Sequence, residues 1–375
     1  MSLGIAGPGP LSDVTVVETG TGVAGAFCGL ILRQLGARVV TFPSDRRFGD
    51  ADADVSVRDL SERAYLEVGK EVVDSAVEGS FFDELVRSCD IVICGVDHST
   101  KDTRSLVRAE YGRMKEVNPR IIFVVLTPFG VDASFDQWSG GDLHAQAISG
   151  WPAFVGNPSE APLGSNYGGG ALQHGLSAAA AALAAFSELS DRQTDTGEFV
   201  DVSGADVIGS SIRMYSHTYR LYGQELKRAG LRAPGSSGRY PHTAFPCKDG
   251  VVSIICRAVD EWRRFVKMLG DPGWASEPRY QDFYAMATQY PDEVDAFVRP
   301  WMLERTKAEL SALAVEFKVP MAPIRTVEEA LNDEQMNHRE FFVESKAGGA
   351  AVRVPGFPAL WKSERLRPSD EKDAR

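Results

Sequence analysis

The glycine- and alanine-rich segment 168–186 contains few side chains that could take part in a chemical reaction. Three glycines open the segment GGGALQHGLSAAAAALAAF (168–186), and Gln173 and His174 are the groups near its start that could bind or exchange a proton. Asp142 opens a second helical pattern, where a carboxylate can do acid–base work but also favours a helix N-terminus for structural reasons alone. Small residues let a helix approach a ligand closely. The segment is therefore expected to hold a ligand while offering little chemistry of its own.

A glycine turn stands in the first strand–helix unit. The motif GTGVAG (20–25) has the GxGxxG spacing of a phosphate-binding turn, whose backbone N–H groups and helix N-terminus favour an anion. A nicotinamide dinucleotide would also need a carboxylate at the end of the second strand, and the sequence there is TFPS (41–44). An NAD-dependent dehydrogenase is therefore disfavoured. Two readings stay open: a tight turn that only packs a helix on a sheet, and a site for another nucleotide-containing ligand.

Strand and helix patterns alternate over the first 130 residues. Apolar strands are expected at 14–18, 37–42, 90–96 and 120–127, with helices near 25–35, 80–88 and 103–117. This spacing predicts right-handed crossovers and a doubly wound parallel sheet, a Rossmann-like α/β fold. The remaining patterns are a strand at 197–203, a long helix near 204–222, an α+β region with a hairpin turning at KDG (248–250), and an extended tail at 350–361.

The amino-acid composition disfavours several classes of function. A net charge of −12 and a pI near 5.1 disfavour a nucleic-acid or anionic-membrane surface, so an anionic ligand would need a local basic patch. Five cysteines without metal-type spacing and isolated histidines predict reduced thiols and no metal site. The first residues lack a signal-peptide pattern and no apolar run is long enough to span a membrane, so a cytoplasmic protein is expected.

Several stretches, taken in order, resemble the family III CoA-transferases, the CaiB/BaiF family. They are PLSDVTVVETGTGVAGAFCGLILRQLGARVV (10–40), EYGRMKEVNPRIIFVVLTPFG (110–130), GGDLHAQAISG (140–150), TGEFVDVSGAD (196–206) and FKVPMAPIRTVEEAL (317–331). The resemblance implies a large Rossmann-like CoA-binding domain built from both chain ends, 1–225 and 326–375, with a small α+β domain, 226–325, inserted between them. It also implies an interlocked homodimer.

The resemblance further implies a reaction. Members of the family move CoA from an acyl-CoA to a free carboxylic acid, and an aspartate attacks the thioester and becomes an aspartyl-CoA thioester. That aspartate lies four residues before Gly175, where this chain has Ala171, flanked by the equally inert Gly170 and Leu172. A methyl group cannot attack a thioester. The racemase branch uses a histidine where Gly141 stands, so acyl-CoA racemase or isomerase activity has less support.

The contacts with CoA follow from the same resemblance. They are expected at Gly20, Thr21, Gly22, Val23, Ala24, Gly95 and Val96, with positive charge supplied by Arg46, Arg47 or Lys70. A family segment that touches CoA, Glu-Asn-Phe-Arg, is replaced here by CGVD (94–97). CoA is then a substrate, and no tightly bound cofactor is implied.

Three hypotheses stay open. In the first, the chain is a family III enzyme whose altered residues act on acyl-CoA, with Asp142 and His174 beside the vacated position as candidates. In the second, it is a non-catalytic member, either the silent subunit of a heteromeric transferase whose partner carries the aspartate or an acyl-CoA-binding protein. In the third, the same fold serves a different function.

Overall fold

The computed structural model describes residues 9–20, 22–42, 57–73, 78–132, 138–165, 168–192, 195–232, 239–347 and 350–359. The chain divides into two compact units. The first unit comprises Met1–Trp151, Gly164–Met214 and Glu334–Arg375. The second comprises Pro152–Leu163 and Tyr215–Asp333. The first unit is therefore assembled from segments that lie far apart in the sequence.

The described part of the first unit is built on a six-stranded sheet with the order β3-β2-β1-β4-β5-β6. Its strands are β1 (Thr15–Gly20), β2 (Arg38–Thr41), β3 (Glu71–Val72), β4 (Ile91–Gly95), β5 (Ile122–Thr127) and β6 (Phe199–Ser203). All neighbouring strands pair in parallel, which confirms the predicted parallel sheet. The order reverses between β1 and β4, and open parallel sheets bind ligands beyond the carboxyl ends of the strands at such a switch point.

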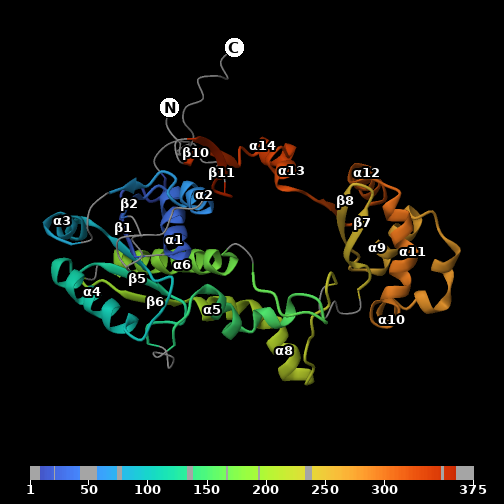
Figure 1. The fold of residues 1–375 in the computed structure, drawn as a ribbon, viewed down its shortest axis with the longest axis horizontal. Coiled ribbons are helices and arrows are strands. Elements are labelled where there is room, and N and C mark those ends of the chain that lie inside the picture. Colours follow the sequence, from blue (N-terminus) through green and yellow to red (C-terminus); the bar gives the residue numbers. More distant parts are fainter. Residues whose placement is uncertain are drawn as a thin grey trace, which may run out of the picture. The chain divides into compact units, whose positions relative to one another are not determined.

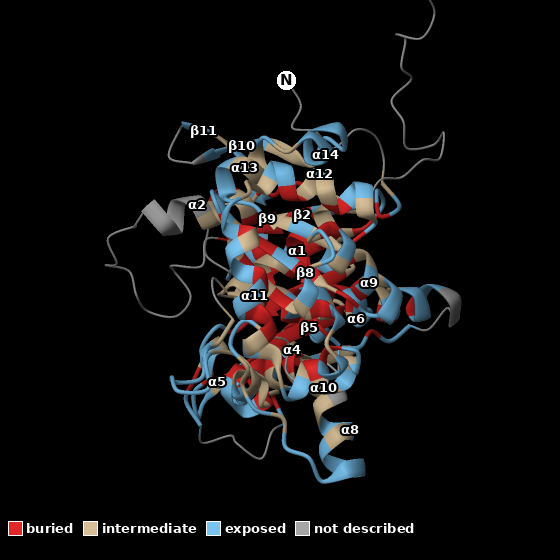
Figure 2. Ribbon diagram, turned by 90° about the vertical axis from the view of Figure 1, so that its right-hand side faces the viewer, coloured by how far each residue is buried: buried red, intermediate tan, exposed pale blue. Residues whose placement is uncertain are grey.

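Helices cover both faces of this sheet (Figure 1). On one face lie α1 (Val23–Gln34) and α6 (Gly169–Arg192), and on the other α3 (Ser80–Ser88) and α4 (Thr103–Val117). Successive side chains of a strand point to opposite faces, so in β4 Ile91 and Ile93 pack toward α1 and α6. Every residue of β4 and β5 is therefore buried, as expected for strands covered on both faces, and the red ribbon at the β5 label in Figure 2 marks part of this core.

The alanine-rich helix α6 packs closely on α1. A side chain on Gly175 would bring its Cβ to 2.4 Å from the carbonyl oxygen of Ala24 and 3.1 Å from the backbone nitrogen of Cys28. Ala178, Ala179 and Ala182 are buried in the same core. The small residues of the segment thus let two backbones approach, and their first role is packing between helices.

The first unit contains three further helices that lie outside the two layers covering the sheet. They are α2 (Val57–Leu66), α5 (Asp142–Ser149) and α7 (Gly204–Gly209). The long helix expected near 204–222 is interrupted, since a 3₁₀ turn (Ser210–Ile212) separates α7 from α8 (Arg213–Tyr222). Gly209 and the two serines that follow are weak helix formers, which explains the break.

The last described segment of the chain returns to the first unit as a hairpin of β10 (Phe342–Ala347) and β11 (Ala350–Pro355), after the short helix α14 (Glu334–His338). Ser345 Oγ donates a hydrogen bond of 2.6 Å to the carbonyl of Ala64 in α2. Val354 packs against Leu30 of α1 and Val68. The hairpin therefore covers an apolar surface formed by residues near the start of the chain.

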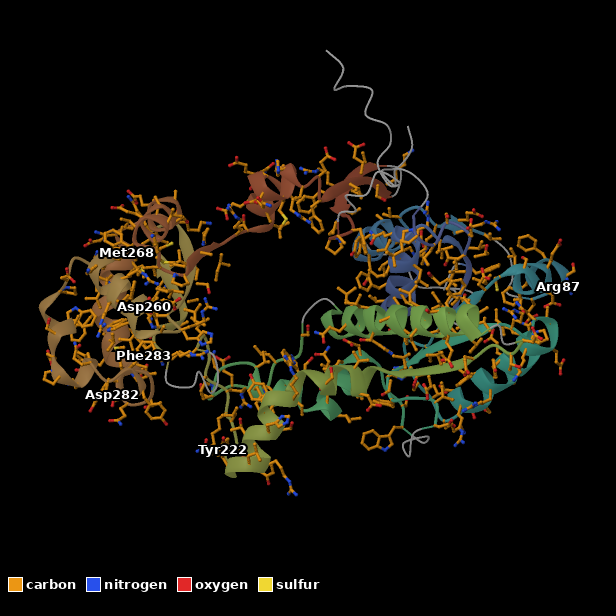
Figure 3. The ribbon with its side chains drawn as sticks, turned by 180° about the vertical axis from the view of Figure 1, so that it is seen from behind. Arg87, Tyr222, Asp260, Met268, Asp282 and Phe283 are labelled. Carbon is orange, nitrogen blue, oxygen red and sulfur yellow. The ribbon has the colours of Figure 1, made fainter. Side chains whose placement is uncertain are left out.

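The second unit has its own antiparallel sheet, β7 (His242–Cys247), β8 (Gly250–Ile255) and β9 (Met321–Ile324). Around it lie α9 (Val259–Met268), α10 (Phe283–Thr288), α11 (Pro291–Leu303), α12 (Lys307–Phe317) and α13 (Val327–Leu331). Asp282, labelled in Figure 3, caps α10 by accepting hydrogen bonds from the backbone of Tyr284 and Ala285 at 2.9 and 3.0 Å. The buried side chains of Phe245, Phe265 and Tyr280 give this unit a separate core.

Candidate functional site

The glycine turn lies at the switch point of the parallel sheet. Gly20 ends β1 with φ 95°, and a Cβ there would lie 2.1 Å from the carbonyl oxygen of Gly95 on β4. Gly22 precedes α1 with φ 90°, and a Cβ there would lie 2.5 Å from the Cβ of Asp97. Both positions require glycine for conformation and for space. Thr21, between them, is outside the described residues.

A cleft of 320 Å³ opens beside this turn. Its described lining consists of Glu18, Thr19, Gly20, Gly22, Val23, Gly25, Ala26, Thr41, Phe42, Glu62, Arg63, Leu66, Glu67 and Asp97. The predicted contacts Gly20, Gly22 and Val23 therefore lie together. Arg63 of α2 contributes the positive charge of this lining, and nothing in the sequence patterns had singled it out. Arg46 and Arg47 lie outside the described residues.

Lys70 lies under α1, in a buried ion pair. Its Nζ donates to Glu18 Oε2 at 2.6 Å and to the carbonyl oxygen of Ala26 at 2.7 Å. The other Glu18 oxygen accepts a hydrogen bond of 3.0 Å from Thr41 Oγ1. A side chain on Gly29 would come within 1.9 Å of Glu18 Oε2, so glycine makes room for the pair. The positive charge of Lys70 is thus used to compensate a buried carboxylate.

A second, smaller cavity of 20 Å³ adjoins the turn and brings the predicted catalytic positions together. It is lined by Gly22, Ala24, Val96, Asp97, Pro128, Asp142, Ala145, Ala171, His174 and Gly204. Ala171 is 6% exposed and belongs to this lining. Residues expected to touch CoA and residues expected near the reacting carbon therefore share one cavity.

Asp142 is half-buried and held in place. Its Oδ2 accepts a hydrogen bond of 2.7 Å from Gln146 Nε2, and Gln146 Oε1 accepts one of 2.6 Å from the backbone of Ser165. A Cβ on Gly170 would lie 2.5 Å from Asp142 Oδ1. The carboxylate therefore fills the space beside the start of α6.

His174 is buried with a defined tautomer. Its Nε2 lies 2.8 Å from the carbonyl oxygen of Val202, and because a carbonyl only accepts, Nε2 carries the proton. Burial lowers the pKa of His174, while the Val202 carbonyl and the Asp142 carboxylate oppose that shift. The imidazole is therefore neutral at neutral pH, with Nδ1 as its acceptor and its proton used in a structural hydrogen bond.

Asp97 lines both cavities, and the sequence patterns did not single it out. It follows β4 in a loop that is tied to the loop before α5, since Ser99 and Gly140 exchange two backbone hydrogen bonds of 3.0 and 3.1 Å. This pairing brings Asp97 near Asp142. Desolvation and then the Asp142 carboxylate raise the pKa of Asp97, while His98 opposes them. The available signal was a carboxylate at the carboxyl end of a strand beside the switch point.

His144, another candidate from the sequence, has a structural role. Its Nδ1 accepts a hydrogen bond of 3.3 Å from the Gly141 backbone at the start of α5.

No group of three or more His, Cys, Asp or Glu side chains within the described segments is placed to hold a metal ion. All five cysteines are buried free thiols. None of the described helices combines the length and apolar character that crossing a membrane requires.

A sequence model of CoA-transferase family III matches residues 11–372. The chain belongs to CoA-transferase family III. Its match to the family covers the parallel sheet, both cavities and the second unit, and this confirms the resemblance on which the site residues were predicted.

Relatives with named activities are similar along nearly the whole chain. The succinate–glutarate CoA-transferase of Agrobacterium fabrum is 24% identical, over 96% of this chain and 91% of its own. The alpha subunit of the succinyl-CoA–L-malate CoA-transferase of Chloroflexus aurantiacus is 26% identical, over 94% of this chain and 83% of its own. The crystal structure of a CaiB/BaiF family protein from Brucella suis has a TM-score of 0.79 at 21% identity, covering 95% of this chain and 93% of that one, which shows a shared fold.

Proposed function

We propose that this chain takes part in the transfer of CoA from an acyl-CoA to a free carboxylic acid. The observation that carries the proposal is the small cavity, because it joins Gly22 and Ala24 of the glycine turn to Asp142, Ala171 and His174. Family membership supports the same reaction. A CoA thioester bound in the larger cleft would then present its carbonyl carbon beside Ala171.

The phosphates of CoA would be bound next to α1. The backbone N–H groups of Val23 and Ala24 belong to the first turn of this helix, where the partial positive charge favours an anion. Gly95 and Val96 would form the opposite wall, at the end of β4. Arg63 supplies charge from α2, and Arg46 and Arg47 are proposed to add to it. The carboxylates of Glu62 and Glu67 make this local charge necessary, because Glu18 is already paired with Lys70.

Succinyl-CoA is the donor proposed first, because the names of similar proteins include it. The purified chain would be mixed with succinyl-CoA and a panel of dicarboxylic acids, and the acyl-CoA products separated by chromatography. Calorimetry with CoA would measure binding separately. Gly22→Val should abolish CoA binding, since the added side chain meets Asp97, whereas Gly112→Ala on α4, where a Cβ meets no atom within 4 Å, should not. A chain that binds no CoA at millimolar concentration would refute the proposal.

A second candidate function is that of a non-catalytic subunit. The buried methyl of Ala171 favours it, because this side chain cannot form a bond to the thioester. Similar proteins include chains named as the alpha subunit of a CoA-transferase and as a subunit of another. Adding a family member that carries the aspartate should then produce transfer that this chain alone lacks. An Ala171→Asp variant that gains activity alone would show that only the nucleophile was missing.

A further inference from the structure

One buried amide joins three segments around the small cavity. Gln146 of α5 is 1% exposed, its Nε2 donates a hydrogen bond of 2.7 Å to Asp142 Oδ2, and its Oε1 accepts one of 2.6 Å from the Ser165 backbone. A Cβ on Gly170, in the first turn of α6, would lie 2.5 Å from Asp142 Oδ1 and 3.1 Å from Gln146 Nε2. A Cβ on Gly164 would come within 3.1 Å of Gln146 Oε1. The amide therefore lies against α5, the chain before α6 and the start of α6.

Few side chains could make both of these hydrogen bonds. A carboxylate only accepts and a backbone N–H only donates, so Gln146 presents its nitrogen to Asp142 and its oxygen to Ser165. A methionine would make neither bond, and an ionised glutamate would only accept and would repel the Asp142 carboxylate. A protonated glutamic acid has the same pair of one donor and one acceptor as the amide. The contacts at this position therefore require an amide or a neutral acid.

Asp142 connects this amide to the candidate site. The carboxylate lines the 20 Å³ cavity together with Ala171 and His174, whereas Gln146 is not among the described lining residues. A carboxylate that loses its hydrogen bond can adopt other side-chain rotamers. In so small a cavity, a rotamer that points further inward would take the space of a substrate group.

We propose that Gln146 is a positioning residue for the acyl end of a bound acyl-CoA, an inference that rests on the proposed CoA-transferase function. Gln146 holds the Asp142 carboxylate against the first turn of α6 and so keeps the small cavity free for the thioester group. The CoA moiety in the larger cleft does not depend on this contact, because neither residue is in the described lining of that cleft. Loss of the amide should therefore weaken the binding of acyl-CoA and spare the binding of CoA itself.

Calorimetry tests this inference with two ligands, neither of which is a thioester. One is CoA, and the other is the ketone analogue of succinyl-CoA, in which a methylene group separates the sulfur from the carbonyl. Gln146→Met should bind CoA like the unmodified chain and bind the analogue on the order of tenfold more weakly, since a buried hydrogen bond is lost. The matched control is Gln281→Met in the second unit, which removes a 2.7 Å hydrogen bond to the Ala275 carbonyl and should leave both affinities unchanged.

Gln146→Glu decides the question if Gln146→Met folds poorly. Burial and the Asp142 carboxylate would both raise the pKa of the introduced acid above its ordinary value of about 4.3. Below that raised pKa the neutral acid makes both hydrogen bonds, and above it the carboxylate repels Asp142. At pH about 5 the variant should bind the analogue like the unmodified chain, and its relative affinity should fall as the pH rises to about 8. Comparison with the unmodified chain at each pH removes the titrations of Asp97 and His174.

The other outcomes are also decisive. In a Gln146→Met chain whose circular dichroism is unchanged, equal loss of both ligands indicates a general structural role, and no loss indicates none, so either overturns the positioning role. A Gln146→Glu chain that binds the analogue weakly at low pH also overturns it. An unmodified chain that binds CoA and the analogue equally overturns the role and leaves the CoA site intact. Absence of CoA binding by the unmodified chain refutes the proposed function and this inference with it.

Discussion

The carboxylate of Asp142 raises the pKa of Asp97, second to the effect of desolvation. Asp142→Asn should therefore lower the Asp97 pKa, so that Asp97 stays ionised to lower pH. The titration of the Asp97 side-chain carboxyl carbon, followed by NMR, should therefore move to lower pH. Gln146→Met is the matched control, because it removes the hydrogen bond to Asp142 and keeps its charge. A titration midpoint that is unchanged, or that moves to higher pH, would contradict this prediction.

His174 should make the stability of the folded chain depend on pH. Burial lowers its folded pKa below the unfolded value of about 6.5, so the unfolded chain binds the proton first as pH falls. The stabilisation that the neutral His174 imidazole contributes to the fold is complete above the unfolded pKa. It is lost as the pH falls from there toward the folded pKa, with a slope of at most about 1.4 kcal/mol per pH unit. His174→Asn should flatten the dependence of Tm on pH between about pH 5 and 7. His242, whose pKa burial also lowers, will leave a remaining slope. An equal slope in the variant would be evidence against a buried neutral imidazole.

Contact between α1 and α6 depends on the missing side chain of Gly175. Gly175→Ala would place a methyl 2.4 Å from the Ala24 carbonyl oxygen, so the helices must separate. We expect a loss of about 1–3 kcal/mol in the free energy of unfolding and weaker CoA binding, because α1 carries the glycine turn. Gly112→Ala on α4 meets no atom within 4 Å and should instead stabilise by about 0.5–1 kcal/mol. Chemical denaturation of both variants measures the difference, and equal effects would show that the close approach is unimportant.

The buried Lys70–Glu18 ion pair should contribute far more to the stability of the fold than the exposed Arg38–Glu71 pair at the edge of the sheet. Lys70→Met leaves the Glu18 carboxylate buried without its cation, at an expected cost of about 3–5 kcal/mol. Arg38→Met breaks the exposed Arg38–Glu71 pair, which at 2.7 Å is nearly as short as the 2.6 Å buried pair, at a cost of about 0–1 kcal/mol. Denaturant midpoints compare the two. If Lys70→Met lost CoA affinity without losing stability, Lys70 would be a ligand contact instead, as the family resemblance suggested.

Elements with strong periodicity could be predicted, and contacts between loops could not. The helix at 80–88 and the alternating strands follow from local patterns, and the parallel sheet follows from their order. The break after Gly209 depends on a balance of weak helix preferences that a periodic pattern hides. The place of Asp97 beside the small cavity was missed because it depends on the pairing of Ser99 with Gly140, two residues 41 positions apart that share no sequence signal. For the same reason the sequence could not show that the Lys70 charge is compensated by Glu18.

At the scale of the whole molecule, we predict the homodimer that the family resemblance implies. The second unit exposes large apolar side chains at the end of α8 and beyond, with Leu221 68%, Tyr222 73% and Leu231 71% accessible in a single chain. Tyr222 is labelled at the end of α8 in Figure 3. Covering these side chains would be favourable by about 25 cal/mol per Å² of apolar surface. Sedimentation at micromolar concentration should give twice the mass of 40.8 kDa, and Leu221→Asp should shift the protein toward the monomer. A single species at 40.8 kDa for the unmodified chain would contradict the prediction.

The hairpin of β10 and β11 has a consequence for synthesis on the ribosome. Leu30 and Val68 are made early, but Val354, which packs against them, is made several hundred residues later. Because translation adds about 5–20 residues per second, this apolar surface stays exposed for tens of seconds before the β10–β11 hairpin is made. The second unit, whose last segment ends at Asp333, leaves the ribosome before the hairpin does. The nascent chain therefore carries a complete second unit while its first unit still exposes a surface that chaperones can bind.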